Sequence, residues 1–163
     1  MFWRKQSGRT GLTYEEAVLE ALCFGWIDSK GAKLDDDRTM LWMSPRKRGS
    51  GWARTNKVRI EQLLAEGLMA PAGLALIDEA KRDGSWTLLD DVENLVVPDD
   101  LAAALDAHPG ARERWDALPR SVRRGALEQL VQAKRPETRA KRVAEFARVT
   151  AEGERPGQWR PSS

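Results

Sequence analysis

The sequence predicts an α+β protein: a small N-terminal lobe of a helix, a β-hairpin or short sheet and further helices, packed on an all-helical C-terminal lobe. The 163 residues are 41% hydrophobic, which is enough for one ordinary domain or two small lobes. Two short extended segments flank an acidic turn between residues 26 and 45. After Pro98, apolar residues recur only at helical spacing. The net charge is −4 over residues 1–111 and +6 over 112–163, which also indicates two different lobes.

The first strong element is a helix that we expect over residues 14–24. Thr13 and Glu16 have the spacing of a capping box, in which each side chain satisfies a free backbone N–H group at the helix start. Gly25 follows, and glycine readily adopts the left-handed conformation that ends a helix. Before this helix, the segment 2–5 has the composition of a further short strand.

A hairpin and two helices complete the N-terminal lobe. Residues 26–30 and 39–43 are the expected strands, joined through the acidic run 35–37. The apolar stripe then predicts a second helix over 52–66, which a glycine ends. A third helix is expected from Pro71 to a glycine at position 84, because proline suits the first helical turn.

The C-terminal lobe is predicted to be a set of helices. We expect Asp99 to cap one helix and Ser121 to cap another that runs to Lys134, and Pro136 to open the last. A short helix carrying Trp115 lies between them. The predicted organisation is an α+β lobe over 1–84, a packed linker over 85–98, a helical lobe over 99–152 and a frayed tail over 153–163.

Composition excludes several classes of site. With one cysteine, Cys23, and one histidine, His108, the chain forms neither an internal disulfide nor a zinc site from Cys and His alone. Cys23 lies in an apolar stretch, which favours a buried structural thiol over a nucleophile, and His108 precedes a proline at a helix end. No apolar run has the length of a membrane span, and the N-terminus lacks a signal-peptide core. We therefore expect a cytoplasmic protein without a cofactor or metal.

The segment 45–59 is the most informative for binding. It holds six basic residues, and no acid occurs between Asp37 and Glu61. A Gly-Ser-Gly turn leads into a helix N-terminus, where backbone N–H groups and the helix dipole favour an anion. Arginine grips a carboxylate or phosphate with two bonds, and tryptophan can stack on a ligand. The alternative is a solvated basic loop followed by a core tryptophan. Neither usual nucleotide-binding glycine motif is present.

Acidic and arginine-rich segments have simpler interpretations. Asp28 is expected to be a buried carboxylate that pairs with an arginine, such as Arg38 across the hairpin, in a structural or functional role. The run 35–37 lacks the spacing of a calcium loop, which favours a solvated turn over a metal site. The arginines of 112–148 are interleaved with glutamates. Because a nucleic-acid footprint is usually a stripe of one sign, this pattern argues against nucleic acid binding.

Several segments together resemble the YdeI/OmpD-associated family, also labelled bacteriocin-protection proteins. The resemblance extends over about residues 2–153. Its most distinctive segment is ALCFGWIDS at 21–29. The other matching segments follow in the family's order: LDDDR at 34–38, PRKRGSGW at 45–52, NKVR at 56–59, LAEGLMAPAGL at 64–74 and AKRPETR at 133–139.

The resemblance implies an α+β N-terminal lobe and a helical C-terminal lobe, but no established activity. It connects the chain with envelope stress and with resistance to antimicrobial peptides or bacteriocins. Where the family often has threonine this chain has Ala70, and where it often has serine this chain has Ala53. Family members usually carry a further N-terminal helix and strand. Their absence here predicts either a truncated chain or an open sheet edge at which another strand can pair.

The function we infer from the sequence is non-enzymatic binding of an anionic small molecule or acidic peptide. Two alternatives remain open: an enzyme that uses Asp28 with the basic loop 45–59, and an interaction module, for nucleic acid or protein, that uses the arginine-rich C-terminal helices. No catalytic or metal-ligating residue is assigned. The candidate ligand-binding residues are Trp26, Asp28, Arg38, Arg46, Arg48, Trp52, Asn56 and Arg59.

Overall fold

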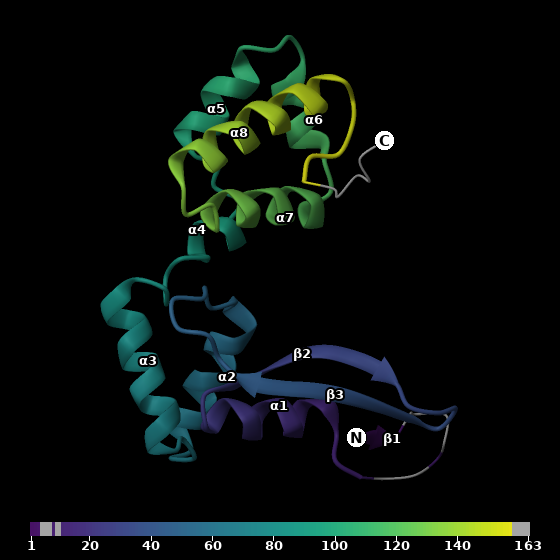
Figure 1. Cartoon of the computed structure of the whole chain (residues 1–163), viewed down its shortest axis with the longest axis vertical. Helices are drawn as coiled ribbons and strands as arrows, with labels where there is room; N and C mark the ends of the chain where they lie inside the picture. The colour runs from purple at the N-terminus through teal and green to yellow at the C-terminus, as the bar shows by residue number, and fades with distance from the viewer. Residues whose placement is uncertain (4–7, 9–10, 158–163) are drawn as a thin grey trace. The chain divides into compact units, whose positions relative to one another are not determined.

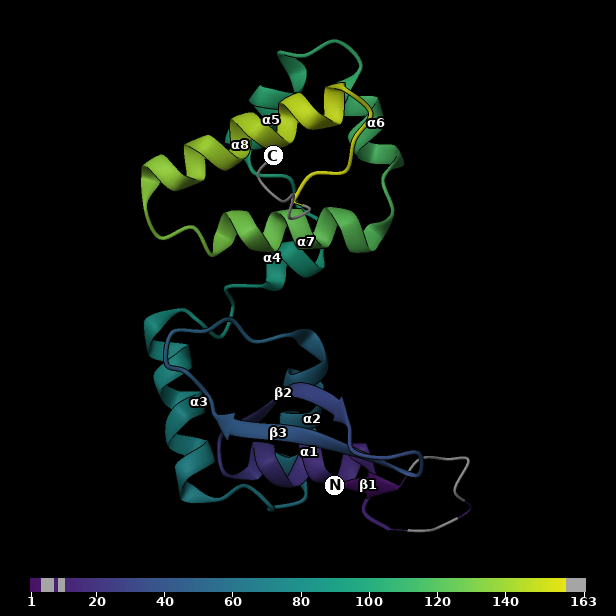
Figure 2. The ribbon, with the colours of Figure 1, turned by 45° about the vertical axis from the view of Figure 1, so that its right-hand side comes forward.

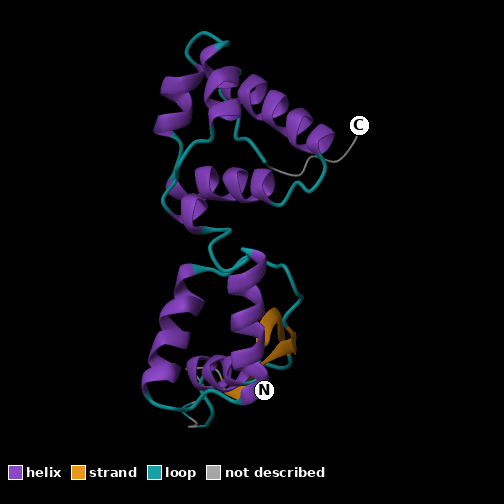
Figure 3. Ribbon diagram, turned by 90° about the vertical axis from the view of Figure 1, so that its left-hand side faces the viewer, coloured by secondary structure: helices purple, strands orange, loops and turns teal. Residues whose placement is uncertain are grey.

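A computed structural model describes residues 1–3, 8 and 11–157 of the chain. These residues divide into two compact units, Met1–Thr87 (Unit 1) and Leu88–Ser163 (Unit 2). Unit 1 combines helices with an antiparallel sheet, and the described part of Unit 2 is helical throughout (Figure 3). The predicted α+β class is confirmed.

Unit 1 is a three-stranded sheet with three helices. The strand order is β1-β3-β2, and α1 lies along the β2–β3 hairpin (Figures 1 and 2). The strand predicted at the N-terminus is present as β1, although positions 4 and 5 lie outside the described residues. The elements are β1 (Phe2–Trp3), α1 (Tyr14–Cys23), β2 (Trp26–Lys33), β3 (Arg38–Pro45), α2 (Arg54–Ala65) and α3 (Pro71–Asp83).

Both ends of α1 follow from the sequence. Thr13 accepts a hydrogen bond from the backbone of Glu16, and the Glu16 side chain accepts one from the Thr13 backbone, so the predicted capping box is confirmed. Gly25 has a φ of 75°, which a residue with a side chain adopts only at a cost. The chain can therefore turn directly from α1 into β2.

The β2–β3 hairpin has one irregularity, which changes the register of its two strands. Trp26 lies opposite Pro45, and the register shifts between Asp28 and Gly31. Two residues of β2 there oppose one of β3, which is the arrangement of a β-bulge. Arg38 lies beyond the bulge, near the turn end of β3.

Two helices cover the rest of Unit 1. The sequence predicts that α2 begins at Trp52, but it begins two residues later, and Ala53 occupies the N-cap position without a side-chain cap. Ala70 likewise precedes α3 without capping it. Trp52 instead lies in the core, with 3% of its surface exposed. The buried residues of this core are Val18, Leu22, Cys23, Trp52, Ile60, Leu63, Ile77 and Ala80.

A close backbone contact joins α3 to the end of α1. The Ala70 N–H group donates to the Cys23 carbonyl at 3.1 Å. A Cβ atom on Gly73 would lie 2.2 Å from the same carbonyl oxygen. A Cβ on Gly25 would lie 2.2 Å from the Cδ1 atom of Leu76. Gly73 is therefore required by its distance from a backbone atom, whereas Gly25 is required by its backbone conformation.

Unit 2 packs five helices around a core of its own. The sequence predicts Asp99 and Ser121 as helix caps, but the N-cap positions of α5 and α7 are taken by Pro98 and Pro119, whose rings preset an extended entry into the helix. The helix predicted to reach Lys134 ends earlier. The elements are α4 (Asp90–Glu93), α5 (Asp99–Asp106), α6 (Ala111–Ala117), α7 (Arg120–Val131) and α8 (Pro136–Ala151).

The apolar residues of the segment 85–98 are shared between the units. Trp86 packs against the core of Unit 1, whereas Leu89 and Val92 are buried in the core of Unit 2. Trp115 is fully buried in that second core. The end of the chain, 158–163, lies outside the described residues.

The Gly73 contact gives a direct stability prediction. We expect Gly73→Ala to lower the free energy of unfolding of Unit 1 by roughly 1–3 kcal/mol, because its methyl group overlaps a backbone oxygen that cannot easily move. Denaturant unfolding followed by circular dichroism measures the change.

Gly125→Ala is the matched control. Gly125 also lies in a helix, α7, but its Cβ would meet no atom within 4 Å. The alanine should stabilise Unit 2 by roughly 0.5–1 kcal/mol through helix propensity alone. Equal effects of the two substitutions would show that the contact at Gly73 does not constrain the fold.

Candidate functional site

The eight candidate residues separate into two clusters and two isolated positions. Arg46, Arg48 and Trp52 belong to the basic loop after β3. Asp28, Asn56 and Arg59 belong to a polar cluster that also involves α1. The isolated positions are Trp26 and Arg38.

Arg46 is the buried centre of the basic loop. Only 7% of its surface is exposed. The backbone N–H group of Arg46 donates to the Gly25 carbonyl at 3.0 Å, which joins the end of β3 to the α1–β2 turn. Its guanidinium carbon lies 3.8 Å from the centre of the Trp52 ring, the distance of a stacked cation–π pair. Its Nη2 atom donates to the carbonyls of Gly51 and Ser50.

The charge of Arg46 is incompletely compensated. Its Nε and Nη1 atoms are buried and have no hydrogen-bond partner among the described residues. Burial lowers the pKa of the guanidinium to about 10, and no carboxylate contributes to the shift. At neutral pH the side chain is thus a buried cation with two unpaired donor groups, an arrangement that proteins usually avoid.

Aromatic rings and further cations surround Arg46. Trp52 and Trp86 lie with their ring centres 5.1 Å apart, at an interplanar angle of 48°. The Nζ atoms of Lys57 and Lys81 lie 5.4 and 5.5 Å from the Trp86 ring centre. Trp52 therefore supports Arg46 from within the core, and is not free to stack on a ligand. The sequence predicts that Trp86 lies in a packed segment, but it does not predict that Trp86 joins Trp52 and Arg46 in one cluster.

A small cavity opens beside Arg46. Its volume is about 10 Å³, which is about the space of one water molecule or one oxygen atom. Lys47, Arg48 and Ser50 line it together with Arg46, and Glu79 and Asp83 line its other side. Arg48 is exposed and pairs with Glu79 at 3.1 Å, and the backbone of Ser85 donates to Asp83 at 2.8 Å. Both acids on the cavity wall therefore already have partners.

The polar cluster lies between α1, α2 and β2. Arg59 grips Glu15 with two bonds of 2.6 and 2.7 Å and donates to Asn56 at 2.9 Å. This pairing lowers the pKa of Glu15. Tyr14 donates to Asp28 at 2.8 Å, which raises the pKa of the tyrosine, because the bond and the negative charge both favour the protonated phenol.

The predicted pair between Asp28 and Arg38 is wrong. Arg38 pairs instead with Asp35, through bonds of 2.5 and 2.6 Å, three residues earlier in the same turn. Asp35 is close to Arg38 in sequence, so this pair forms without a contact across the bulged hairpin. Asp28 is half-buried, does not line the cavity at Arg46, and is occupied by Tyr14.

The remaining candidates have structural surroundings. Cys23 is buried, and burial raises the pKa of its thiol, which confirms the predicted structural cysteine. His108 follows the end of α5, as expected for a helix-end histidine. Asp36 pairs with Lys33 in the acidic turn. In the part of the chain that the structure describes, no group of three or more His, Cys, Asp or Glu side chains gathers as for a metal ion, and no helix is long and apolar enough to cross a membrane.

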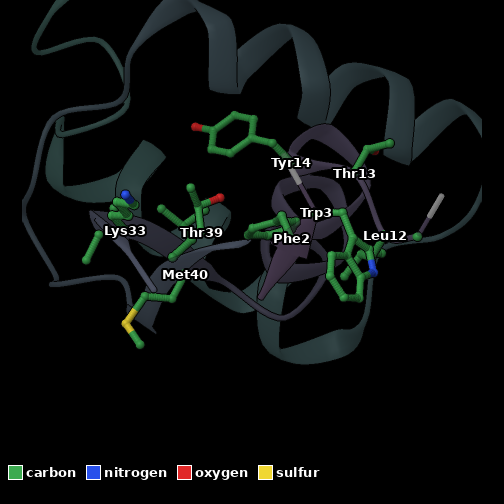
Figure 4. Close-up of a pocket in the computed structure, with 12 residues that line it drawn as sticks. Phe2, Trp3, Leu12, Thr13, Tyr14, Lys33, Thr39 and Met40 are labelled. Carbon is green, nitrogen blue, oxygen red and sulfur yellow. The ribbon is translucent and has the colours of Figure 1, made fainter. Parts of the chain in front are cut away.

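Two larger hollows flank the sheet near β1. One has a volume of about 770 Å³, and Phe2, Trp3, Tyr14, Lys33 and Thr39 are among its lining residues (Figure 4). The other has about 570 Å³ and is lined almost entirely by apolar side chains, including Trp26. Trp26 and Trp52 thus line different pockets.

Several arginines of Unit 2 bind to groups within that unit. Arg139 grips Asp100 with two bonds of 2.7 and 2.9 Å, which lowers the pKa of the aspartate and joins α8 to α5. Arg112 pairs with Asp106 at 3.0 Å, and Arg124 bridges two glutamates. Much of the positive charge of Unit 2 therefore lies in ion pairs and hydrogen bonds between its own helices.

Comparison with known proteins divides the chain at the same place as the structure. Residues 94–153 match the family described as Bacteriocin-protection, YdeI or OmpD-Associated, so the predicted family relationship is confirmed for that segment. Residues 1–76 match a different family, described as a domain of unknown function (DUF8412). The resemblance drawn from the N-terminal motifs is thus not confirmed by that match. No curated protein and no solved structure matches the chain.

Tyr14 permits a clean test of the polar cluster, because it is the only tyrosine in the chain. We expect its absorbance titration to give a pKa above the ordinary value of 10.0. Asp28→Asn should return the pKa towards that value, because it removes the negative charge and the strong acceptor.

Asp78→Asn serves as the control for loss of one negative charge. Asp78 lies on the exposed surface of α3 and does not contribute to the raised pKa of Tyr14. A Tyr14 pKa that moves equally in both variants would contradict the Tyr14–Asp28 bond.

Proposed function

We propose that this chain, whose residues 94–153 match the bacteriocin-protection, YdeI- or OmpD-associated family, is a non-enzymatic binding protein that takes an anionic group on the basic loop of Unit 1. The single observation that carries the proposal is the buried guanidinium of Arg46, with two donor groups unpaired. Arg46 and the basic loop fall within the segment that matches the domain of unknown function, whereas Glu79 and Asp83 of the cavity wall follow it. The proposal therefore concerns the function of that domain.

A buried cation without a carboxylate partner is costly, and an anion relieves the cost. Removing an ionised group from water requires several kcal/mol unless a counter-charge and hydrogen bonds replace the lost hydration. Trp52 and the carbonyls of Ser50 and Gly51 supply part of the replacement. An anionic oxygen next to Nε and Nη1 would supply the rest, through charge-assisted hydrogen bonds.

The cavity sets the size of what enters. Because its volume is about 10 Å³, it admits one oxygen atom of a carboxylate or phosphate, while the remainder of the ligand stays outside. Lys47 is exposed at the mouth, and Gly49, with a φ of 70°, shapes the loop. The ligand class is accordingly a carboxylate or phosphate monoanion or dianion on a small molecule or on an acidic peptide.

The structure narrows the set of arginines that can serve. Arg38 and Arg59 already hold carboxylates with short bonds, so an incoming anion would have to displace them. Arg48 holds Glu79 at 3.1 Å but is largely exposed, and exposed pairs of this kind contribute little. Arg46 is therefore the anchor, with Arg48 as an exchangeable second cation.

Thermal unfolding with and without phosphate tests the proposal. At tenfold excess over Kd, a ligand that binds only the folded state adds about 1.4 kcal/mol of stability. For a unit of this size, we expect a rise in Tm of about 5–10 °C. Potassium chloride should replace phosphate at constant ionic strength in the reference sample, so that screening is matched. Succinate is the carboxylate probe.

Arg46→Met should abolish the phosphate-dependent shift while keeping the length of the side chain against Trp52. Lys30→Met is the control, since Lys30 is an exposed cation on β2 and its loss changes net charge equally. A shift that survives in Arg46→Met, or one that Lys30→Met removes as fully, would show that the anion does not act through Arg46. Absence of any shift with both probes would end the proposal.

A further inference from the structure

We propose that the ligand of the Arg46 site is a zwitterion, with a carboxylate at Arg46 and an ammonium or guanidinium group between Glu79 and Asp83 of α3. This ligand class rests on the proposed anion site at Arg46 and narrows it. Glu79 is then the residue that sets the specificity of the site.

The cavity beside Arg46 has two walls of opposite charge. The basic loop contributes Arg46, Lys47 and Arg48, and α3 contributes Glu79 and Asp83. Arg46 is the buried member of this set, and two of its donor groups lack a partner among the described residues. An anionic group at Arg46 therefore comes close to two carboxylates, which repel a dianion more strongly than a monoanion. A carboxylate consequently fits better than a phosphate monoester.

The two acids occupy unfavourable positions in α3. They are four residues apart and so lie on one face of the helix, where like charges at this spacing repel each other. Asp83 is also the last residue of α3, where the helix dipole disfavours a negative charge. Hydrogen bonds from Ser85, one of them from its backbone at 2.8 Å, hold the pKa of Asp83 below its usual range. Asp83 is therefore ionised at neutral pH, and a cation between the two acids would relieve their repulsion.

The cations of the chain do not fill this position firmly. Lys81 lies over an aromatic ring, and Arg82 donates to a carbonyl of its own helix. Among the described residues, Arg48 is the only cation that forms an ion pair with either acid. The side chain of Arg48 is 77% exposed, against 27% for that of Glu79. Because exposed pairs of this kind contribute little, a cationic group of the ligand can replace Arg48 at Glu79.

The exposure of the charged groups places the two ends of the ligand. Arg46 is buried, Glu79 is half-buried and Asp83 is exposed, so the positive site lies inside and the negative site lies at the rim. One carboxylate oxygen fills the cavity of about 10 Å³. The cationic group then stays at the rim and keeps part of its hydration, which avoids most of the cost of burying a second charge.

Matched pairs of ligands test the proposal on the full chain. Each pair consists of a straight-chain fatty acid and the ω-amino acid of the same carbon number, from two to six carbons. The two members differ only by an ammonium group. Dissociation constants are measured by NMR titration of the Ser50 and Gly51 amides at constant ionic strength. In at least one pair, we expect the amino acid to bind about fivefold more tightly than the fatty acid.

Glu79→Gln should remove this preference through opposite changes in the two ligands. The amino acid should bind more weakly, because its ammonium group loses a carboxylate. The fatty acid should bind at least as tightly as before, because a repelling charge is lost and Arg48 is released. A variant that had lost its fold would bind both ligands more weakly. Asp78→Asn is the matched control, since Asp78 lies on the same helix and does not line the cavity.

Arg48→Met tests the exchange of cations at Glu79. We expect it to increase the preference for the amino acid, because the competing guanidinium is removed while Glu79 remains. Weaker binding of both ligands to the same extent would show that Arg48 holds the carboxylate and is not displaced, and would overturn the proposal. Lys30→Met, which removes an exposed cation of β2, should leave the preference unchanged.

The outcomes separate this proposal from the one on which it rests. If every fatty acid binds as tightly as its amino acid, the zwitterion is overturned while the anion site at Arg46 stands. If no ligand of the series binds and phosphate gives no thermal shift, both proposals are overturned. The zwitterion is likewise overturned if Asp78→Asn removes the preference as fully as Glu79→Gln does.

Discussion

The close approach of α3 to the end of α1 is the constraint on which the geometry of Unit 1 depends. Gly73 lies against the Cys23 carbonyl, and the Ala70 N–H group bonds to that same oxygen. Gly25 continues the turn with a positive φ and passes beneath Leu76. Its own carbonyl then holds Arg46. One tight turn thus orients a helix, starts a strand and fixes the entry of the basic loop.

Placing Arg46 by its backbone explains why its side chain can be buried. The guanidinium is not drawn inwards by a carboxylate, because burial alone accounts for the lowered pKa. It is held there by the strand end and by the face of Trp52, which Trp86 supports in turn. The fold therefore bears the cost of a desolvated cation at this position, and a bound counter-charge reduces that cost. Replacing Trp52 would remove the packing that excludes water from the guanidinium.

Local rules predicted the parts of the fold that depend on few residues. The capping box at Thr13 and the glycine turns after α1 and α3 follow from conformational preferences of single residues. Burial of Arg46 could not be predicted in this way, since it requires β3, α2 and Trp86 together. The prediction that Arg38 pairs with Asp28 was wrong for a similar reason, because Arg38 pairs with the nearer Asp35 and not across the strands. No local signal pointed to Tyr14 as the true partner, since its side chain is 47% exposed and its hydroxyl could equally bond to water.

The alternation of residues along β3 fixes where the basic loop begins. Even-numbered residues of β3 bond towards β2, and this series ends with the backbone N–H group of Arg46 on the Gly25 carbonyl. The bulge between Asp28 and Gly31 sets this parity, because it absorbs one extra residue of β2. A slip of one residue would detach Arg46 from Gly25. The bulge therefore keeps the basic loop in register with the turn between α1 and β2.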